Sequence, residues 1–338
     1  RLRFDIRYHY ESTGTGSVDV VTPTPDSCFL GFANAELPTG IDFYQGKVRD
    51  VFDLDSELII STSDRISAFD QILGEVPFKG EILNRLSIFW FEATKDIVPN
   101  HYLAMVSPRA MLVKKCRVVP VEVVVRGYLT GSAWRDYLAG RPVSGIELPD
   151  DMKFNQKFDT PILTPSTKEV DGMHDRPVSR DEVIYSGVVD PDLWERIETT
   201  ALALYHRGQE MAAERGLILV DTKYEFGVRD DELYLVDELH TPDSSRYWFA
   251  DTYEELFQAG EKQRKVDKEY LRQWLMEQGY SGDGRPPEIP EEVFMEVSRR
   301  YQSAFEVVTG KNFTPNSTDP EAEKRKILLF IEERQEEN

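Results

Sequence analysis

Carboxylates placed at the spacing of a β-strand are the first residues in the sequence that could do chemistry. In "LVDTKYEFG" the alternation of side chains along a strand puts Asp221, Lys223 and Glu225 on one face. A second apolar stretch, "YLVDE", carries Asp237 near its end. Carboxylate oxygens are ligands that Mg²⁺ prefers, so the two stretches predict a surface that binds a cation.

The tight acidic turn between these stretches determines which residues face each other. If the turn centres on Asp231, antiparallel pairing sets Glu225 opposite Asp237, with Cβ atoms about 5 Å apart. Two like charges in these positions repel unless a cation lies between them, and such a pair can hold Mg²⁺ together with phosphate oxygens. The alternative is an exposed hairpin whose acidic side chains face water.

Basic residues follow a glycine in "YQGKVRDVF", beside a predicted strand. Gly46, Lys47 and Arg49 in this setting resemble a hairpin that covers phosphates. The stretch is not a Walker A loop, because Gly40 and Gly46 are separated by five residues rather than four and Val48 stands where Ser or Thr should follow the lysine. Taken alone, the pattern also fits a lysine on an ordinary surface turn.

An arginine at the end of a buried strand precedes a helix start in "VVVRGYLTGSAWRDYLAG". Arg126 ends the strand, Gly127 and Gly131 turn the chain, and Ser132 has the character of a helix cap. An arginine beside a helix N-terminus predicts an anion site, because free N–H groups and the helix dipole both favour negative charge. An ordinary cap with a surface arginine is the alternative.

A long loop, "TPSTKEVDGMHDRPVS", gathers Lys168, His174, Asp175 and Arg176. Long loops in compact domains are often functional. A His–Asp catalytic pair is disfavoured, because the two residues are sequence neighbours and no Ser or Cys nucleophile is placed for them.

Strands and helices in mixed order must position these residues. Strand patterns cover residues 46–54 and 57–63 as a hairpin, 116–127 with an interruption at Pro120, and 217–228 with 232–240. A helix begins at the cap Asp190, takes Pro191 in its first turn and stops at Gly216. Further helices are predicted over residues 81–97, 251–279, 290–310 and 319–335.

This order predicts an α+β fold with two mixed lobes and a helical C-terminal extension. We expect an extended lead-in with little core of its own over residues 1–40 and a mainly β lobe over residues 41–117. A central α+β lobe follows over residues 118–250, and the helical extension covers residues 251–338.

Composition excludes several kinds of partner. The 338 residues carry a net charge of −21, which disfavours nonspecific binding to nucleic acid or anionic membranes but leaves room for a small phosphorylated ligand in a local basic pocket. Cys28 and Cys116 are too few for a disulfide framework or zinc site and fit a reducing cytosol. The longest apolar stretches are too short to span a bilayer, and no signal-peptide pattern is visible, so we expect a cytoplasmic protein.

Taken together, these stretches resemble the SAICAR synthetase family, the phosphoribosylaminoimidazole-succinocarboxamide synthases of purine biosynthesis. The matching segments run in family order from about residue 44 to 250, and the helix "DKEYLRQWL" resembles the longer form of the family, to about residue 310. The segments are "GKVRDVF", "STSDRISAFD", "VPVEVVVRGYLTGSAW", "MHD", "GLILVDTKYEFG" and "VDELHTPDSSRYW". Residues 1–40 and the last twenty or so match nothing in the family pattern.

The resemblance implies an ATP-grasp-like pair of lobes with nucleotide in the cleft. It also implies a ligase that uses ATP and Mg²⁺ to join L-aspartate to the carboxylate of 5-amino-1-(5-phosphoribosyl)imidazole-4-carboxylate (CAIR). The products are SAICAR, ADP and phosphate, and the expected route activates the CAIR carboxylate as an acyl phosphate. A carboxylate is a poor electrophile, so it needs a leaving group, and cations must neutralise the transferring phosphoryl group.

By the same resemblance, the mainly β lobe covers the nucleotide and the central lobe is catalytic. ATP phosphates are expected at Lys47, Val48 and Arg49, and the adenine hinge at Lys115, Cys116, Arg117 and Val118. Glu225 and Asp237 are expected to hold Mg²⁺ and, with Lys47, to be catalytic. The CAIR phosphate is expected at Arg126, Ser132 and Arg246, its imidazole amine at Asp221, and remaining substrate contacts at Lys168, Asp175 and Asp64.

Three alternatives differ in class. Another ATP-dependent carboxylate–amine ligase or a small-molecule kinase could use the same lobes on a phosphorylated substrate. A noncatalytic nucleotide-binding module would be expected to lack a metal ligand or the phosphate lysine, whereas Lys47, Glu225 and Asp237 are present. An interaction scaffold built on the acidic helices would not explain the cleft residues. The long C-terminal extension favours a monomer.

Overall fold

The computed structural model describes residues 24, 27–33, 35–69, 71–168, 176–266, 269–282, 284–316 and 319–337. Within them the first lobe contains an antiparallel sheet with strand order β1-β2-β3-β7-β6. Its strands are β1 (Asp42–Gln45), β2 (Arg49–Asp53), β3 (Glu57–Thr62), β6 (Tyr102–Ser107) and β7 (Ala110–Lys114). β4 (Arg65–Ala68) and β5 (Gln71–Glu75) follow β3 in the chain and form a separate two-stranded sheet.

The second sheet is organised around one long strand. β11 pairs with four others, in the order β10-β9-β11-β12 with β8 and β13 also on β11. Its strands are β8 (Arg117–Val118), β9 (Val121–Tyr128), β10 (Lys157–Thr167), β11 (Leu217–Arg229), β12 (Glu232–Val236) and β13 (Ser245–Phe249). The predicted interruption at Pro120 is confirmed, because Pro120 lies between β8 and β9.

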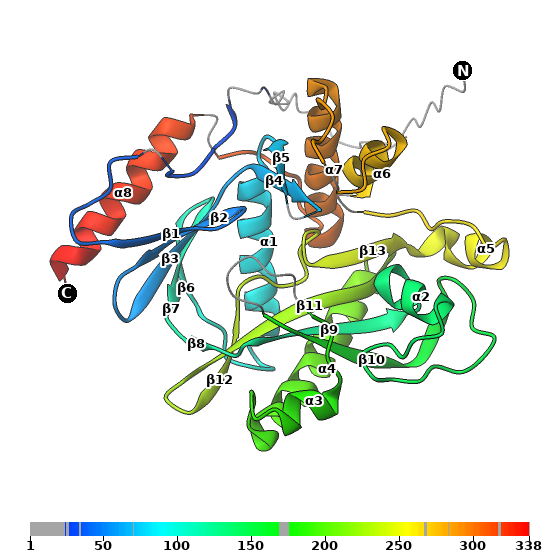
Figure 1. Ribbon diagram of the computed structural model, residues 1–338. Helices are drawn as coiled ribbons and strands as arrows, with labels where there is room; N and C mark the ends of the chain where they lie inside the picture. The colour runs from blue at the N-terminus through cyan, green and yellow to red at the C-terminus, as the bar shows by residue number, and fades with distance from the viewer. Residues whose placement is uncertain are drawn as a thin grey trace.

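Helices cover both sheets. α1 (Lys79–Thr94) packs against β3, β6 and β7 and, on another side, against α7 (Glu291–Thr309), so that it lies near the centre of the molecule (Figure 1). α4 (Pro191–Ala213) packs against β9 and β11 beneath the second sheet, beside α3 (Arg180–Tyr185) (Figure 1). Most of the buried apolar side chains form one core that runs through these layers.

The sequence signals at the ends of α4 are confirmed. Asp190 caps the helix by accepting hydrogen bonds from the backbone N–H groups of Asp192 and Leu193, at 3.0 and 3.3 Å. Pro191 occupies the first helical position, where its missing N–H costs nothing. Gly216, with φ +68°, follows the helix and turns the chain into β11.

The single helix predicted over residues 251–279 is wrong. The chain forms η2 (Ala250–Thr252), α5 (Tyr253–Gln258) and α6 (Glu269–Glu277). Gly260 has φ +69°, which ends the first helical part. The chain then runs beside β13, where the Val266 N–H donates to the Tyr247 carbonyl at 3.0 Å. Backbone pairing with a strand has overridden a helical sequence pattern.

The two ends of the described chain meet on the first lobe. α8 (Pro320–Glu337) packs on the first sheet, where it contacts β6, and lies at the left of Figure 1. Ile327 and Ile331 of α8 are fully buried in one cluster with Phe29 and Phe32. Residues 27–33 of the predicted lead-in therefore contribute apolar side chains to a core shared with the first lobe.

The predicted register of the acidic hairpin is wrong by one residue. β11 and β12 pair so that Arg229 faces Glu232 and Glu225 faces Val236. The turn therefore consists of Asp230 and Asp231, both with positive φ (53° and 60°), the geometry of a two-residue type I′ turn.

The α+β class, the two sheets and the helical C-terminal region confirm the predicted fold. The division at residues 40, 117 and 250 stays a prediction. No helix within the described ranges is long and apolar enough to cross a membrane.

Candidate active site

A cavity of about 390 Å³ opens where the ribbon β4–β5, the second sheet and α6 meet. Its walls carry more polar and charged side chains than apolar ones. The lining residues are Ile66, Ser67, Ala68, Phe69, Val124, Arg126, Ser132, Asp221, Thr222, Lys223, Pro242, Asp243, Ser244, Ser245, Arg246, Leu271 and Arg272.

Two arginines share one carboxylate in this cavity. Arg126 on β9 and Arg246 on β13 both lie opposite Asp221, because β11 runs between those two strands. Arg246 Nη1 donates to Asp221 Oδ2 at 2.7 Å, and Arg126 Nη1 donates to the same oxygen at 3.4 Å. Asp221 therefore orients both guanidinium groups through one carboxylate oxygen, Oδ2.

The start of α2 (Gly131–Leu138) joins the arginines. Arg126 Nη2 donates to Ser132 Oγ at 3.2 Å, and its Nε donates to Thr164 Oγ1 at 2.8 Å. A methyl group added at Gly131 would come within 2.3 Å of Arg246 Nη1, so the guanidinium packs against the glycine backbone. Burial lowers the pKa of Arg126, although Asp221 favours its charged form. The predicted grouping of Arg126, Ser132 and Arg246 is thus present.

A chain of alternating charges continues along the same face of β11. Lys223 Nζ donates to Glu225 Oε1 at 2.7 Å and to Glu122 Oε1 of β9 at 2.9 Å. Lys168 Nζ pairs with the other Glu225 oxygen. Burial disfavours the charge on Lys223, but Glu225, Asp237 and Glu122 outweigh burial and raise its pKa.

Asp237 leaves the hairpin with a special backbone conformation. It follows β12 with φ +68°, which turns its side chain away from the strand's regular alternation. Its carboxylate pairs with Arg49, and Arg49 Nη2 also lies 3.0 Å from Glu238 Oε2. Burial favours the neutral acid, but the charges of Arg49, Lys223 and Lys168 outweigh it and lower the pKa of Asp237.

Cations, rather than a direct pairing, connect Glu225 with Asp237. Lys168 and Lys223 contact Glu225 and also stabilise the charge of Asp237. The expectation that the two carboxylates face each other as a cross-strand pair is wrong, because Glu225 faces Val236. No cluster of three or more His, Cys, Asp or Glu side chains suited to a metal exists among the residues that the structure describes.

Hydrogen bonds to backbone carbonyls fix the turn that carries Lys47. Gly46 N–H donates to the Arg49 carbonyl at 2.7 Å, which closes a turn between β1 and β2. Arg65 donates through Nε to the Lys47 carbonyl and through Nη2 to the Gly46 carbonyl, at 3.0 and 3.1 Å. The same guanidinium pairs with the fully buried Asp50 at 2.7 Å.

The predicted hinge segment, residues 115–118, connects β7 of the first sheet with the second sheet. Arg117 and Val118 form β8, which pairs with Val228 and Gly227 of β11. Lys115 Nζ lies 2.5 Å from Asp53 Oδ2 at the surface of the first lobe.

Asp64, one of the predicted substrate contacts, does not line the cavity. Asp64 is fully buried and accepts hydrogen bonds from the N–H groups of Phe29 and Gly80, at 2.8 Å each, and from Arg109 at 2.6 Å. These contacts tie the first lobe together, so Asp64 has a structural role. Asp175, with His174, lies outside the described residues.

A contact from the C-terminal region reaches the cavity and was missed by sequence reasoning. Asp243 lines the cavity in the loop before β13. Its carboxylate accepts a hydrogen bond from the hydroxyl of Tyr301 on α7 and lies 3.0 Å from Nζ of the buried Lys79. Tyr301 sits on a helix with an ordinary amphipathic pattern, so no sequence signal marks it.

Other missed residues are Arg65, Lys223 and Glu238, which contact predicted site residues, and Glu122, which contacts Lys223. Lys223 had a signal, because strand alternation already places it on the face of Asp221 and Glu225.

The fold and site define a two-lobed protein in which one strand, β11, runs from a pair of arginines to a cluster of buried carboxylates and cations. A family model described as SAICAR synthetase matches residues 42–287. Among curated relatives, the phosphoribosylaminoimidazole-succinocarboxamide synthase of Bacteroides thetaiotaomicron is 48% identical over 295 residues, covering 85% of this chain and 94% of the relative. That of Legionella pneumophila (strain Paris) is 46% identical over 283 residues, covering 81% and 89%.

Solved structures agree. The SAICAR synthase of Saccharomyces cerevisiae complexed with SAICAR superposes with a TM-score of 0.73 at 33% identity, covering 83% of this chain and 99% of the yeast chain. A type-2 SAICAR synthetase in complex with ADP shares the fold, with a TM-score of 0.62 at 24% identity, covering 81% of this chain and all of the other. This chain belongs to the SAICAR synthetase family, and it is therefore a ligase.

Proposed function

We propose that this enzyme joins L-aspartate to the carboxylate of CAIR with the conversion of ATP to ADP and phosphate. The observation that carries the assignment is the common face of β11. Asp221 orients two arginines at one end of this face, and Glu225, four residues along, faces the cation cluster. Four residues of strand span about 13 Å, which separates a phosphate end from a reacting end on the scale of a ribonucleotide.

The phosphate of CAIR is assigned to Arg126, Ser132 and Arg246. Guanidinium groups bind phosphate through two parallel hydrogen bonds, and the α2 N-terminus adds N–H groups and a favourable dipole. Asp221 holds both guanidinium groups in place before substrate binds. This geometry supports an orienting role for Asp221, and any contact with the imidazole amine would use the carboxylate oxygen that does not accept from the arginines.

The nucleotide is assigned to the turn at Lys47, Val48 and Arg49 and to the segment 115–118. Arg65 fixes the turn through two backbone carbonyls, so the turn can present its side chains and N–H groups to phosphates without reorganising. The short strand β8 leaves backbone groups at the junction of the two sheets, which suits hydrogen bonding to an adenine edge.

Mg²⁺ is assigned to Glu225 and Asp237. The donor set fits, because hard divalent cations take one or two carboxylates together with phosphate oxygens. Here Lys168 and Arg49 neutralise these carboxylates, so metal binding would free both cations for phosphate oxygens. A bound Mg²⁺ would supply charge neutralisation for the transferring phosphoryl group.

The reaction balances as two displacements. A CAIR carboxylate oxygen attacks the γ-phosphorus and ADP leaves, which gives an acyl phosphate; the aspartate amine then attacks the acyl carbon and phosphate leaves, and the amine loses a proton. We assign to Lys47, Lys168 and Arg49 the stabilisation of negative charge in the first displacement. Lys168, at the edge of the segment that carries Asp175, is a proposed contact for the aspartate carboxylates. A cytoplasmic monomer completes the proposal.

A comparison of steady-state constants tests the assignment. Arg246→Lys keeps a positive charge but loses the planar fork, so the KM for CAIR should rise at least tenfold while the KM for ATP changes less than twofold. A panel of other acids in an ADP-release assay should show strong preference for CAIR. Equal ADP release with an acid that lacks a phosphate would contradict the function, and a collapse of ATP affinity in Arg246→Lys would contradict the residue assignment.

A further inference from the structure

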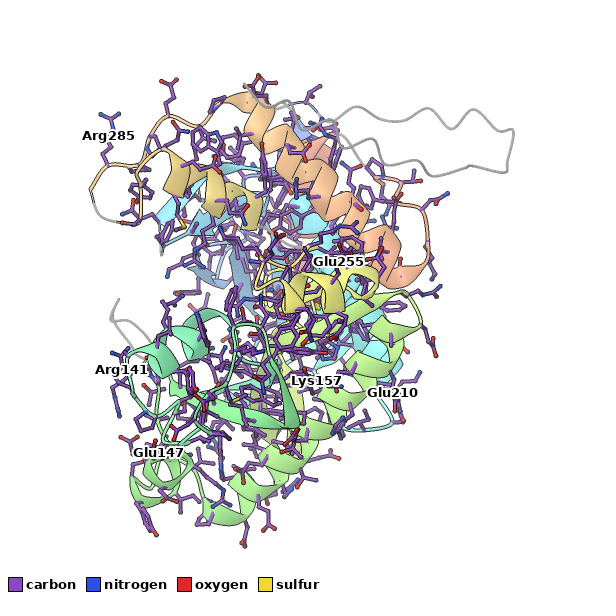
Figure 2. All side chains as sticks on the ribbon, turned by 90° about the vertical axis from the view of Figure 1, so that its right-hand side faces the viewer. Arg141, Glu147, Lys157, Glu210, Glu255 and Arg285 are labelled. Atoms are coloured by element: carbon purple, nitrogen blue, oxygen red, sulfur yellow. The ribbon has the colours of Figure 1, made fainter. Side chains whose placement is uncertain are left out.

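A second chamber adjoins the active-site cavity. It has a volume of about 480 Å³ and shares Phe69, Arg246 and Arg272 with the first cavity. Its outer walls are α2, the extended segment that follows α5, and α6. Figure 2 faces this side of the molecule, with α6 above α2 and α5, marked by Glu255, beside them. The proposed function leaves this chamber without a ligand.

The chamber is basic in an acidic protein. Five of its lining side chains are cationic, and no Asp or Glu lines it among the described residues. The cations are Arg135, Arg246, Lys262, Lys265 and Arg272. The whole chain carries a net charge of −21, so five cations in one concave site without an acid depart strongly from the average surface. Such a site concentrates small anions.

The chamber also contains groups that call for hydrogen bonds. Gln263 lines it and is only 6% exposed, and Gln263 Nε2 donates to the Tyr253 carbonyl at 3.2 Å. Its Oε1 is buried without a hydrogen-bond partner among the described residues. A buried amide oxygen left in this state costs free energy, which a ligand hydroxyl would recover. Thr130, the N-cap of α2, makes no capping hydrogen bond with its side chain.

The chamber wall is partly aromatic. Trp134 and Phe154 lie with ring centroids 5.5 Å apart, and the Arg272 guanidinium lies 4.7 Å from the ring centre of Phe69. The cations can bind a phosphate, the rings can pack against a carbon skeleton, and the Gln263 oxygen can accept from a hydroxyl group. This combination fits a phosphorylated sugar better than a simple dicarboxylate.

We propose that this chamber is a second ligand site, for a sugar phosphate or the sugar-phosphate part of a nucleotide. Lys262 and Arg135 contact the phosphate, and Gln263 accepts a hydrogen bond from a sugar hydroxyl. Arg246 borders both cavities, so a phosphate in the chamber competes for this guanidinium with the substrate phosphate. Binding at the two sites is therefore mutually weakening, and by linkage each ligand reduces the affinity of the other by the same factor.

Calorimetric titration of ribose 5-phosphate into the enzyme tests the proposal. With CAIR and Mg²⁺–ADP saturating, the wild-type enzyme should still bind close to one equivalent. Lys262→Ala and Arg135→Ala should each weaken this binding about tenfold or more, as expected for loss of a charge-assisted contact. Gln263→Leu should weaken ribose 5-phosphate but not inorganic phosphate. Lys95→Ala, at an exposed lysine on the opposite lobe, is the matched control and should bind normally.

Three results would overturn the proposal. The first is no binding once the active site is saturated, and the second is unchanged affinity in both Lys262→Ala and Arg135→Ala. The third is a raised KM for L-aspartate in Lys262→Ala with normal ribose 5-phosphate binding, which would assign the chamber to aspartate. If CAIR failed to bind, the proposed function would be wrong. Titration of ribose 5-phosphate without CAIR would still show two bound equivalents, one in the chamber that depends on Lys262 and one in the first cavity that depends on Arg126.

Discussion

Lys47 and Arg49 occupy the same turn but have different tasks. Arg49 pairs with Asp237 and Glu238 across the lobe boundary. Burial lowers the pKa of Arg49, but the charges of these two acids outweigh burial and raise it. Arg65 holds the Lys47 backbone carbonyl, and the Lys47 side chain is the group that we assign to the ATP phosphates. At the scale of single residues, the role of each charged side chain in the site therefore depends on which oppositely charged group it contacts.

Lys47→Ala should reduce turnover far more than stability. The side chain is assigned to developing phosphoryl charge rather than core packing, and loss of one such contact costs on the order of 3 kcal/mol in the barrier, or about 100-fold in kcat. Single-turnover ADP formation and urea unfolding measure the two effects, with Lys95→Ala as the control. A variant with near-normal kcat and an intact fold would remove Lys47 from the mechanism.

Asp237→Asn should destabilise the enzyme even without metal. A mutually repelling pair of carboxylates would make this change neutral or stabilising, but Asp237 instead neutralises Arg49, and the amide leaves that guanidinium with Glu238 alone. We expect a loss of about 2 kcal/mol in the free energy of unfolding. Asp96→Asn, which breaks the exposed pair with Arg207, is the control and should cost much less stability than Asp237→Asn, because solvent screens an exposed ion pair.

The same Asp237→Asn protein should lose most magnesium-dependent turnover, because an amide supplies an oxygen without the charge. An Asn variant with unaltered magnesium dependence would contradict the proposed metal site, whatever its stability.

At the scale of elements, β11 organises the site and α7 supports it from outside. The strand brings residues from β9 and β13 to its two edges at the same height, where Arg126 and Arg246 both face Asp221. α7 packs on α1 and sends Tyr301 to Asp243, on the loop that leads into β13. α7 thus positions a loop of the substrate cavity, although it contributes no residue to the cavity wall.

Tyr301→Phe should raise the KM for CAIR several-fold with a smaller change in kcat. The substitution keeps the ring and removes the hydroxyl that donates to Asp243, while the ion pair of Asp243 with Lys79 remains. The expected stability cost is about 1 kcal/mol.

Ser298→Ala is a matched control for Tyr301→Phe on the same helix. Ser298 Oγ donates to the Pro77 carbonyl at 2.8 Å, so its loss should cost similar stability without affecting the KM. Equal effects of the two variants on KM would show that Tyr301 acts through helix packing alone.

At the scale of the whole molecule, the enzyme combines a strongly acidic surface with a basic interior site and buried neutral histidines. His240 is fully buried between Tyr224, whose hydroxyl lies 2.6 Å from Nε2, and Trp90. Burial lowers the pKa of His240 to about 3. The unfolded chain binds a proton at this residue near pH 6.5, whereas the folded chain does not until much lower pH.

Stability should therefore fall as the pH drops below 6.5. Between pH 7 and pH 5 the contribution of His240 is about 2 kcal/mol, because the unfolded state gains a proton that the folded state refuses. His240→Asn should flatten the pH dependence of urea unfolding by this amount, whatever its stability at pH 7. His206→Ala, at an exposed position, should leave the slope unchanged. An unaltered slope in His240→Asn would contradict the assignment.

The sequence by itself determined the features that depend on neighbours along the chain. Asp190 and Pro191 predict the start of α4 because capping involves residues two or three positions apart. Alternation predicts that Asp221, Lys223 and Glu225 share a face because a strand has a period of two. The motif order from "GKVRDVF" to "VDELHTPDSSRYW" predicts the family, and the helical end of the chain predicts the fold class.

Only the tertiary structure decided which charges meet. Arg49 and Asp237 are 188 residues apart, and Tyr301 reaches a loop 58 residues earlier, so no local periodicity encodes either contact. The hairpin register depended on whether Asp230 and Asp231 both take positive φ, a choice that pairing along β11 and β12 settles and composition does not. Residues 261–266 left their helical pattern because β13 offered backbone partners. Local sequence patterns were enough to identify the candidate residues, whereas the partner of each residue depends on packing between distant parts of the chain.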